Sequence, residues 1–116
     1  MWRMKKVFLI IFGVLFVAHL AYAHPPLAIN IKYDPETKQV TANIAHEVSN
    51  PKRHYINKVV VKINGVVVEL KRLFFQTNAK EQIIMIAIPT ARPGDVIVIE
   101  AYCNKGGRLA QEINVK

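Results

Sequence analysis

Three histidines and one cysteine are the side chains after residue 23 that are best suited to bind a metal ion. His24 precedes the first strand-like run, His46 and His54 flank the polar loop 47–53, and Cys103 stands just before the turn sequence "NKGG". Imidazole and thiolate are the commonest protein ligands for transition metals. Their spacing differs from that of zinc fingers, in which paired ligands stand two to four residues apart. A shared site therefore requires a fold that brings distant segments together.

Cys103 is the only cysteine of the 116-residue chain, so it cannot close an internal disulfide. A free cysteine is either a buried apolar side chain or a reactive or metal-binding thiolate. A thiol hydrolase is disfavoured, because no glycine flanks Cys103 to form an oxyanion loop and no helix is expected nearby. The sequence also lacks a phosphate-binding glycine loop and the paired acids of a glycosidase.

The first 23 residues have the three parts of a secretory signal peptide. The basic start "MWRMKK" is followed by the apolar run 7–23, which ends in Ala21-Tyr22-Ala23. Cleavage after Ala23 is expected, and the protein is then periplasmic or secreted. The alternative is a retained anchor helix, for which the apolar run is at the short limit. Cleavage would make His24 the first residue, and its α-amine, with a pKa of about 7.7–8.0, would become a possible second nitrogen donor.

Residues 24–116 have the length of one small domain with a core just large enough to fold alone. The whole chain has 16 basic and 8 acidic residues, a net charge of +8. After the signal segment the only adjacent basic pairs are Lys52-Arg53 and Lys71-Arg72. Without a basic stripe or interleaved aromatics, nucleic acid is not an expected partner. Membrane contact is expected only through the signal segment, whereas the positive surface could attract a small anion.

Almost every segment after residue 26 has the period-two alternation of a β-strand, and no window of eleven or more residues there has a helical period. Turn signals separate the runs, and Asn64-Gly65 is the strongest hairpin signal among them. The pattern predicts seven strands in an immunoglobulin-like antiparallel β-sandwich. The antibody type is excluded because no tryptophan follows residue 2. The expected strands are 27–33, 39–46, 54–63, 66–75, 82–88, 96–103 and 108–115.

All four candidate ligands lie at the ends of these expected strands, where a sandwich gathers its loops. Alternation places Cys103 on the same face as Ile99 and Ala101. Because one loop joins His46 to His54, these two side chains are expected to lie close together. This arrangement favours a joint site over four unrelated residues.

The stretches "AHEVSNPKRHYI" (45–56) and "EAYCNKGG" (100–107) resemble the iron-binding domain of superoxide reductases, the desulfoferrodoxin and neelaredoxin family. The motifs of that family include Glu-His-Tyr-Ile and, near the C-terminus, Tyr-Cys-Asn-x-His-Gly. "HPP" at 24–26 is similar to part of its early Lys-His-x-Pro motif. The resemblance covers nearly all of residues 24–116 and implies the seven-stranded immunoglobulin-like fold.

The resemblance also implies a mononuclear iron held by equatorial histidines and an axial cysteine thiolate. His24, His46 and His54 would supply three imidazoles and Cys103 the thiolate, which would be the catalytically important ligand. Gly106 stands where the family has its fourth histidine, so the chain would be a divergent member. The implied activity is one-electron reduction of superoxide or another small oxidant, with electrons from an external donor. A homo-oligomer formed through edge strands is compatible with the sequence.

Two other interpretations remain open at this stage. The same ligands, with the α-amine of His24, could form a carrier site for copper, because thiolate and imidazole suit that metal. Alternatively, the domain is a metal-free β-sandwich interaction module in which Cys103 is simply buried.

Overall fold

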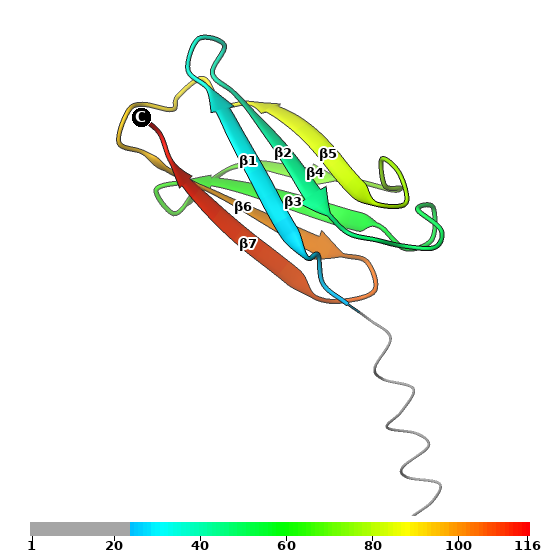
Figure 1. Ribbon diagram of the computed structural model, residues 1–116. Coiled ribbons are helices and arrows are strands. Elements are labelled where there is room, and N and C mark those ends of the chain that lie inside the picture. Colours follow the sequence, from blue (N-terminus) through cyan, green and yellow to red (C-terminus); the bar gives the residue numbers. More distant parts are fainter. Residues whose placement is uncertain (1–23) are drawn as a thin grey trace, which may run out of the picture.

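Seven antiparallel β-strands form two sheets in residues 24–116, the part of the chain that the computed structural model describes (Figure 1). The signal peptide predicted for residues 1–23 lies outside these described residues. No helix within residues 24–116 could span a membrane. The strands are β1 (Ala28–Asp34), β2 (Gln39–Ala45), β3 (Ile56–Ile63), β4 (Val66–Arg72), β5 (Glu81–Ala87), β6 (Val96–Cys103) and β7 (Arg108–Asn114).

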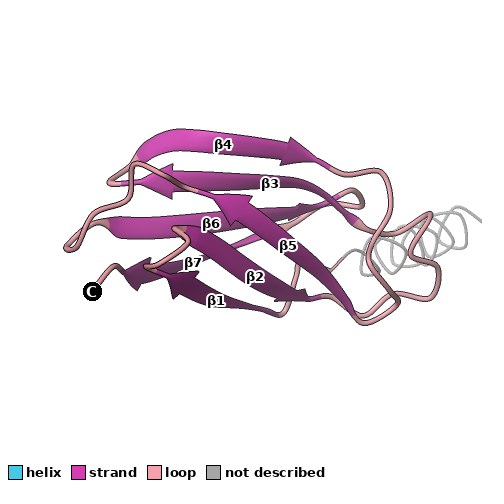
Figure 2. Ribbon diagram, turned by 90° about the horizontal axis from the view of Figure 1, so that it is seen from above, coloured by secondary structure: helices cyan, strands magenta, loops and turns pink. Residues whose placement is uncertain are grey.

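The chain passes between the two sheets three times. One sheet has the strand order β1-β2-β5 and the other has the order β4-β3-β6-β7. The connections β2–β3, β4–β5 and β5–β6 therefore cross from one sheet to the other. The sheets lie face to face, as in a sandwich (Figure 2). The predicted all-β architecture of seven antiparallel strands is confirmed.

The core lies between the sheets and consists mainly of branched aliphatic side chains, which suit a pleated and half-buried surface. Alternation works as the sequence suggests in β6, where Ile97, Ile99, Ala101 and Cys103 are all buried. The central strands β3 and β6 have more buried residues than the other strands. The remaining core side chains are Ile29, Val40, Ala42, Ile44, Ile56, Val59, Val61, Ile63, Ile84, Ile86, Ile88, Ala91 and Val115.

Two predicted strands are longer than the observed ones by two or more residues. The run 54–63 forms a strand only from Ile56, which pairs with Cys103, the last residue of β6. The run 66–75 ends at Arg72, whose partner is Lys58. Beyond that pair, the N–H of Leu73 still donates to the carbonyl oxygen of Asn57 at 2.9 Å, but the ladder does not continue. The other boundaries coincide with the predicted ones or differ by one residue.

Strand register places seven strand ends together at one end of the fold. Ala28 at the start of β1 pairs with Ala45 at the end of β2, which also pairs with Glu81 at the start of β5. In the other sheet, Ile56 at the start of β3 pairs with Cys103 at the end of β6. The crossing connections 46–55 and 73–80 close this end, on the right of Figure 2.

Candidate metal centre

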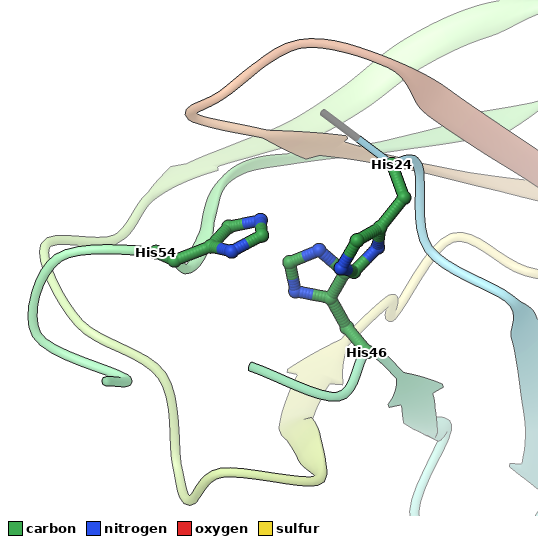
Figure 3. Close-up of side chains that lie close together, drawn as sticks. All are labelled: His24, His46 and His54. Atoms are coloured by element: carbon green, nitrogen blue, oxygen red, sulfur yellow. The ribbon is translucent and has the colours of Figure 1, made fainter. Parts of the chain in front are cut away.

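The three predicted histidines converge at this end of the fold and point toward one another (Figure 3). One ring nitrogen from each of His24, His46 and His54 lies within 4.8 Å of the others. The ring centroids of His46 and His54 are 4.8 Å apart, and that of His24 is 5.0 Å from each of them. Three segments distant in sequence thus present imidazoles to one point.

His46 directly follows β2 and is fully buried. Its backbone N–H donates to the carbonyl oxygen of Lys80 at 2.9 Å, so the segment after β2 stays attached to the one that leads into β5. Its Nδ1 lies 2.8 Å from Oε1 of the buried Gln76. Its Nε2 is buried without a hydrogen-bond partner among the described residues. The ring of His46 points toward the other two rings (Figure 3), which leaves this atom available as a donor or acceptor.

His54 is held beside Cys103 by the asparagine that follows the cysteine. Nε2 of His54 lies 3.1 Å from Sγ of Cys103. Asn104 accepts a hydrogen bond from the N–H of Tyr55 at 2.9 Å and donates one to the carbonyl oxygen of Arg53 at 2.9 Å. Its backbone N–H also donates to the carbonyl oxygen of Tyr55 at 3.0 Å. These three bonds bracket His54 and fix it against the end of β6.

The local turn before His54 is dictated by Asn50 and Pro51. The side-chain oxygen of Asn50 accepts from the N–H of Lys52 at 3.0 Å, and its carbonyl oxygen accepts from the N–H of His54 at 2.9 Å. Such an asparagine turn is a common reason for Asn before Pro in a loop. The turn reverses the chain and carries His54 back to the strand ends.

The environment of His54 favours its neutral form. Burial, followed by the neighbouring imidazoles of His46 and His24 and by Lys105, lowers the pKa of His54 below 6.5. A neutral imidazole keeps the nitrogen lone pair that a metal requires. The buried Sγ of Cys103 accepts a hydrogen bond from the N–H of Lys105 at 3.4 Å.

His24 is positioned by contact between its neighbour Pro25 and Gly107. A Cβ atom at Gly107 would lie 2.9 Å from Cβ, 3.0 Å from Cα and 3.1 Å from N of Pro25. The segment continues through the buried Pro26, and the N–H of Leu27 donates to the carbonyl oxygen of Ala45 at 2.8 Å. The bare α-carbon of Gly107 thus lets the segment that carries His24 lie directly on the β6–β7 turn.

Gly106, the residue before Gly107, has a backbone conformation that disfavours a side chain. Its φ is +111°, and no atom lies within 4 Å of where its Cβ would be. The described residues near the histidines therefore provide three imidazoles and one thiol. An open hollow of about 570 Å³ borders His24 and His54. Its remaining lining residues are Glu47, Val48, Ser49, Ala79 and Lys80.

The residues that hold the histidines in place could not be identified from the sequence. Gln76 lies in the polar connection "QTNAKE", which looks like any turn, and only the contact with His46 distinguishes it. Gly107 belongs to the turn sequence "NKGG", and its contact with Pro25 has no sequence signal. Asn104 stands beside Cys103 in the stretch that carries the resemblance, and that adjacency was the one available hint.

No protein-family model matches this chain, and no curated protein is similar enough to be a relative.

Proposed function

We propose that the protein is an exported mononuclear iron-binding protein related to superoxide reductases. The observation that carries this proposal is the convergence of His24, His46 and His54, with Cys103 beside His54. The three-plus-four division of the strands also supports the immunoglobulin-like topology. The leader at 1–23 would export the chain, so that iron is held outside the cytoplasm.

Cys103 is close enough to the histidines to share an ion with them. Its Sγ lies 3.1 Å from Nε2 of His54. With bond lengths of about 2.1 Å to nitrogen and about 2.3 Å to sulfur, one metal ion could be bound by both atoms.

The histidines also fit an ion in size and in bonding. One ring nitrogen from each histidine lies within 4.8 Å of the others, so the three could converge on one ion. The unpartnered buried Nε2 of His46 would gain the partner that buried polar atoms normally have. Three imidazoles and a thiolate suit iron, copper or zinc, and the choice of iron rests on the resemblance.

Bound iron would supply one-electron chemistry, and a thiolate ligand would increase its electron density, as it does on haem iron. The residues of the chain would hold the ion, orient its ligands and admit a small molecule. Asn104 holds the His54 segment at the cysteine, and the hollow gives a small molecule access to His24 and His54. Lys80 on its rim would attract a small anion such as superoxide.

A copper carrier is the second candidate, because the donor set contains a soft thiolate. If the leader is removed after Ala23, the α-amine of His24 becomes an additional nitrogen donor. The lack of an N–H in Pro25 excludes a site that uses deprotonated amides directly after residue 24. A metal-free interaction module remains as the third interpretation.

Metal analysis of the full chain, expressed with its leader and purified from the exported fraction, tests these alternatives. One iron per chain, with a visible thiolate charge-transfer band that disappears in Cys103→Ser, supports the proposal. One copper per chain supports the carrier, and absence of metal above trace refutes both. Superoxide decay by stopped flow then tests turnover, and a rate no faster than that of Cys103→Ser would refute the reductase activity.

A further inference from the structure

We infer that Gln76 is a positioning residue that fixes the tautomer of His46, so that His46 presents the lone pair of Nε2 to the site. Gln76 lies in the β4–β5 connection, thirty residues from His46, and it is 2% exposed. The use of this lone pair to bind an ion rests on the proposed metal centre, whereas the tautomer of His46 does not.

The hydrogen bonds of Gln76 leave one orientation for its amide. Its Nε2 donates to the carbonyl oxygen of His46 at 2.7 Å and to that of Asn78 at 3.0 Å. A rotated amide would place Oε1 against these two oxygens, with no proton between them. The oxygen of the amide therefore faces His46.

This orientation determines where the proton of His46 resides. Oε1 of Gln76 can only accept, and it lies 2.8 Å from Nδ1 of His46, so Nδ1 must carry the hydrogen. In a neutral imidazole the other nitrogen then holds the lone pair. That nitrogen is Nε2, the buried atom without a partner among the described residues.

The bonded Nδ1 and the unbonded Nε2 of His46 are both accounted for by one role, that of a metal-binding imidazole. Burying an acceptor without a partner is unfavourable, and native proteins rarely do so without a functional reason. The buried amide of Gln76 donates both of its hydrogens to backbone carbonyls, and its oxygen accepts the ring proton of His46. This leaves Nε2 of His46 free. Hydrogen bonding of the second ring nitrogen is the usual way in which proteins orient a metal-binding histidine and raise its basicity.

Gln82 provides a matched control. It is also a buried glutamine (7% exposed) near the same end of the fold, but its amide bonds the backbone of Thr77 and Ile83 and no histidine. Gln76→Leu and Gln82→Leu each remove a buried amide. Gln76→Glu removes the two donated bonds, as Gln76→Leu does, but at alkaline pH it retains an acceptor for Nδ1–H. The comparison of the two Gln76 variants therefore isolates the acceptor.

The first measurement is ¹⁵N NMR of the histidine rings in the metal-free full-length protein at alkaline pH. We expect His46 to carry its proton on Nδ1 in the wild type, in Gln82→Leu and in Gln76→Glu. In Gln76→Leu we expect a shift toward the Nε2–H form. A wild-type His46 protonated on Nε2, or an unchanged tautomer in Gln76→Leu, would overturn the inference.

The second measurement is anaerobic titration with Fe²⁺ and with Co²⁺. We expect Gln76→Leu to bind about 10- to 100-fold more weakly than Gln82→Leu. Equal affinities of these two variants would refute the role of Gln76 in binding. If the wild type binds neither ion, the proposed function fails, whereas the NMR result still decides the tautomer.

Discussion

Because Gly107 contacts Pro25, we expect that a single methyl group added at Gly107 impairs the candidate site. In Gly107→Ala the new Cβ would lie 2.9 Å from Cβ of Pro25. Comfortable carbon–carbon contacts begin at about 3.5 Å, so the segment bearing His24 must move by about 0.6 Å or more. The displaced residue is the direct neighbour of His24, whose imidazole is one of the three that converge.

Gly106→Ala is the matched control, because the two glycines are adjacent and share the same conformational strain. Their φ values are +111° and +88°, where an alanine costs about 1–2 kcal/mol. A Cβ at Gly106 meets no atom within 4 Å, so no overlap is added there. Overpacking costs typically about 1–3 kcal/mol. The expected loss of unfolding free energy is therefore about 1–2 kcal/mol for Gly106→Ala and about 2–5 kcal/mol for Gly107→Ala.

Urea unfolding of the metal-free variants measures the stability difference, and Co²⁺ titration measures the effect on the site. We expect Gly106→Ala to bind Co²⁺ like the wild type. Gly107→Ala should bind about 10-fold more weakly or worse, as is typical when a metal ligand loses its support. If both variants bind equally well, the contact with Pro25 does not position His24 and the reasoning is wrong.

Three further predictions concern the thiolate, the outer face and the core. Cys103→Ser should remove any thiolate charge-transfer band of the Co²⁺-loaded protein, and a band that persists would mean that the sulfur is not a ligand. The buried Glu100 bonds Lys62 and Arg108, and the Lys62 bond above all holds its pKa below the ordinary 4.5. A lowered pKa stabilises the fold above pH 4.5, and this contribution is lost as the pH falls through the lowered value. Glu100→Gln should therefore lower the neutral-pH unfolding free energy by about 1–3 kcal/mol and flatten its loss in acid, whereas the exposed Glu112→Gln should do neither. Ile99→Ala, at a fully buried position of β6, should cost about 2–5 kcal/mol by urea unfolding.

Much of the fold could be predicted from the sequence because strand alternation is a local signal. Val40, Ala42 and Ile44 alternate with polar residues, and the structure buries all three. The Asn64-Gly65 turn lies between β3 and β4 as its hairpin signal indicates, with positive φ at both residues. The start of β3 could not be predicted, because it depends on where its partner β6 ends, at Cys103.

The candidate site could be predicted only as far as strand ends determine it. His46 follows one strand and His54 precedes the next along the chain, so their proximity could be predicted from the short loop that joins them. The supporting contacts could not be predicted. Gln76 and His46 are thirty residues apart in sequence, and Gly107 and Pro25 lie near opposite ends of the domain's sequence. Such contacts depend on three-dimensional packing. The glycine-type φ of Gly106 is likewise invisible in the sequence, and it implies that a histidine there would strain the present turn.

The dispersion of the candidate ligands along the chain has a consequence for the order of assembly. His24 precedes the first strand and Cys103 ends the sixth, so no short stretch contains a complete ligand set. Contacts between distant segments form only after the entropy of closing the intervening chain has been overcome. An ion bound by these residues would therefore not act as a template for early folding, as zinc does in small finger domains. It would be acquired by an already closed pair of sheets, and metal loading would be a separate, final step of maturation.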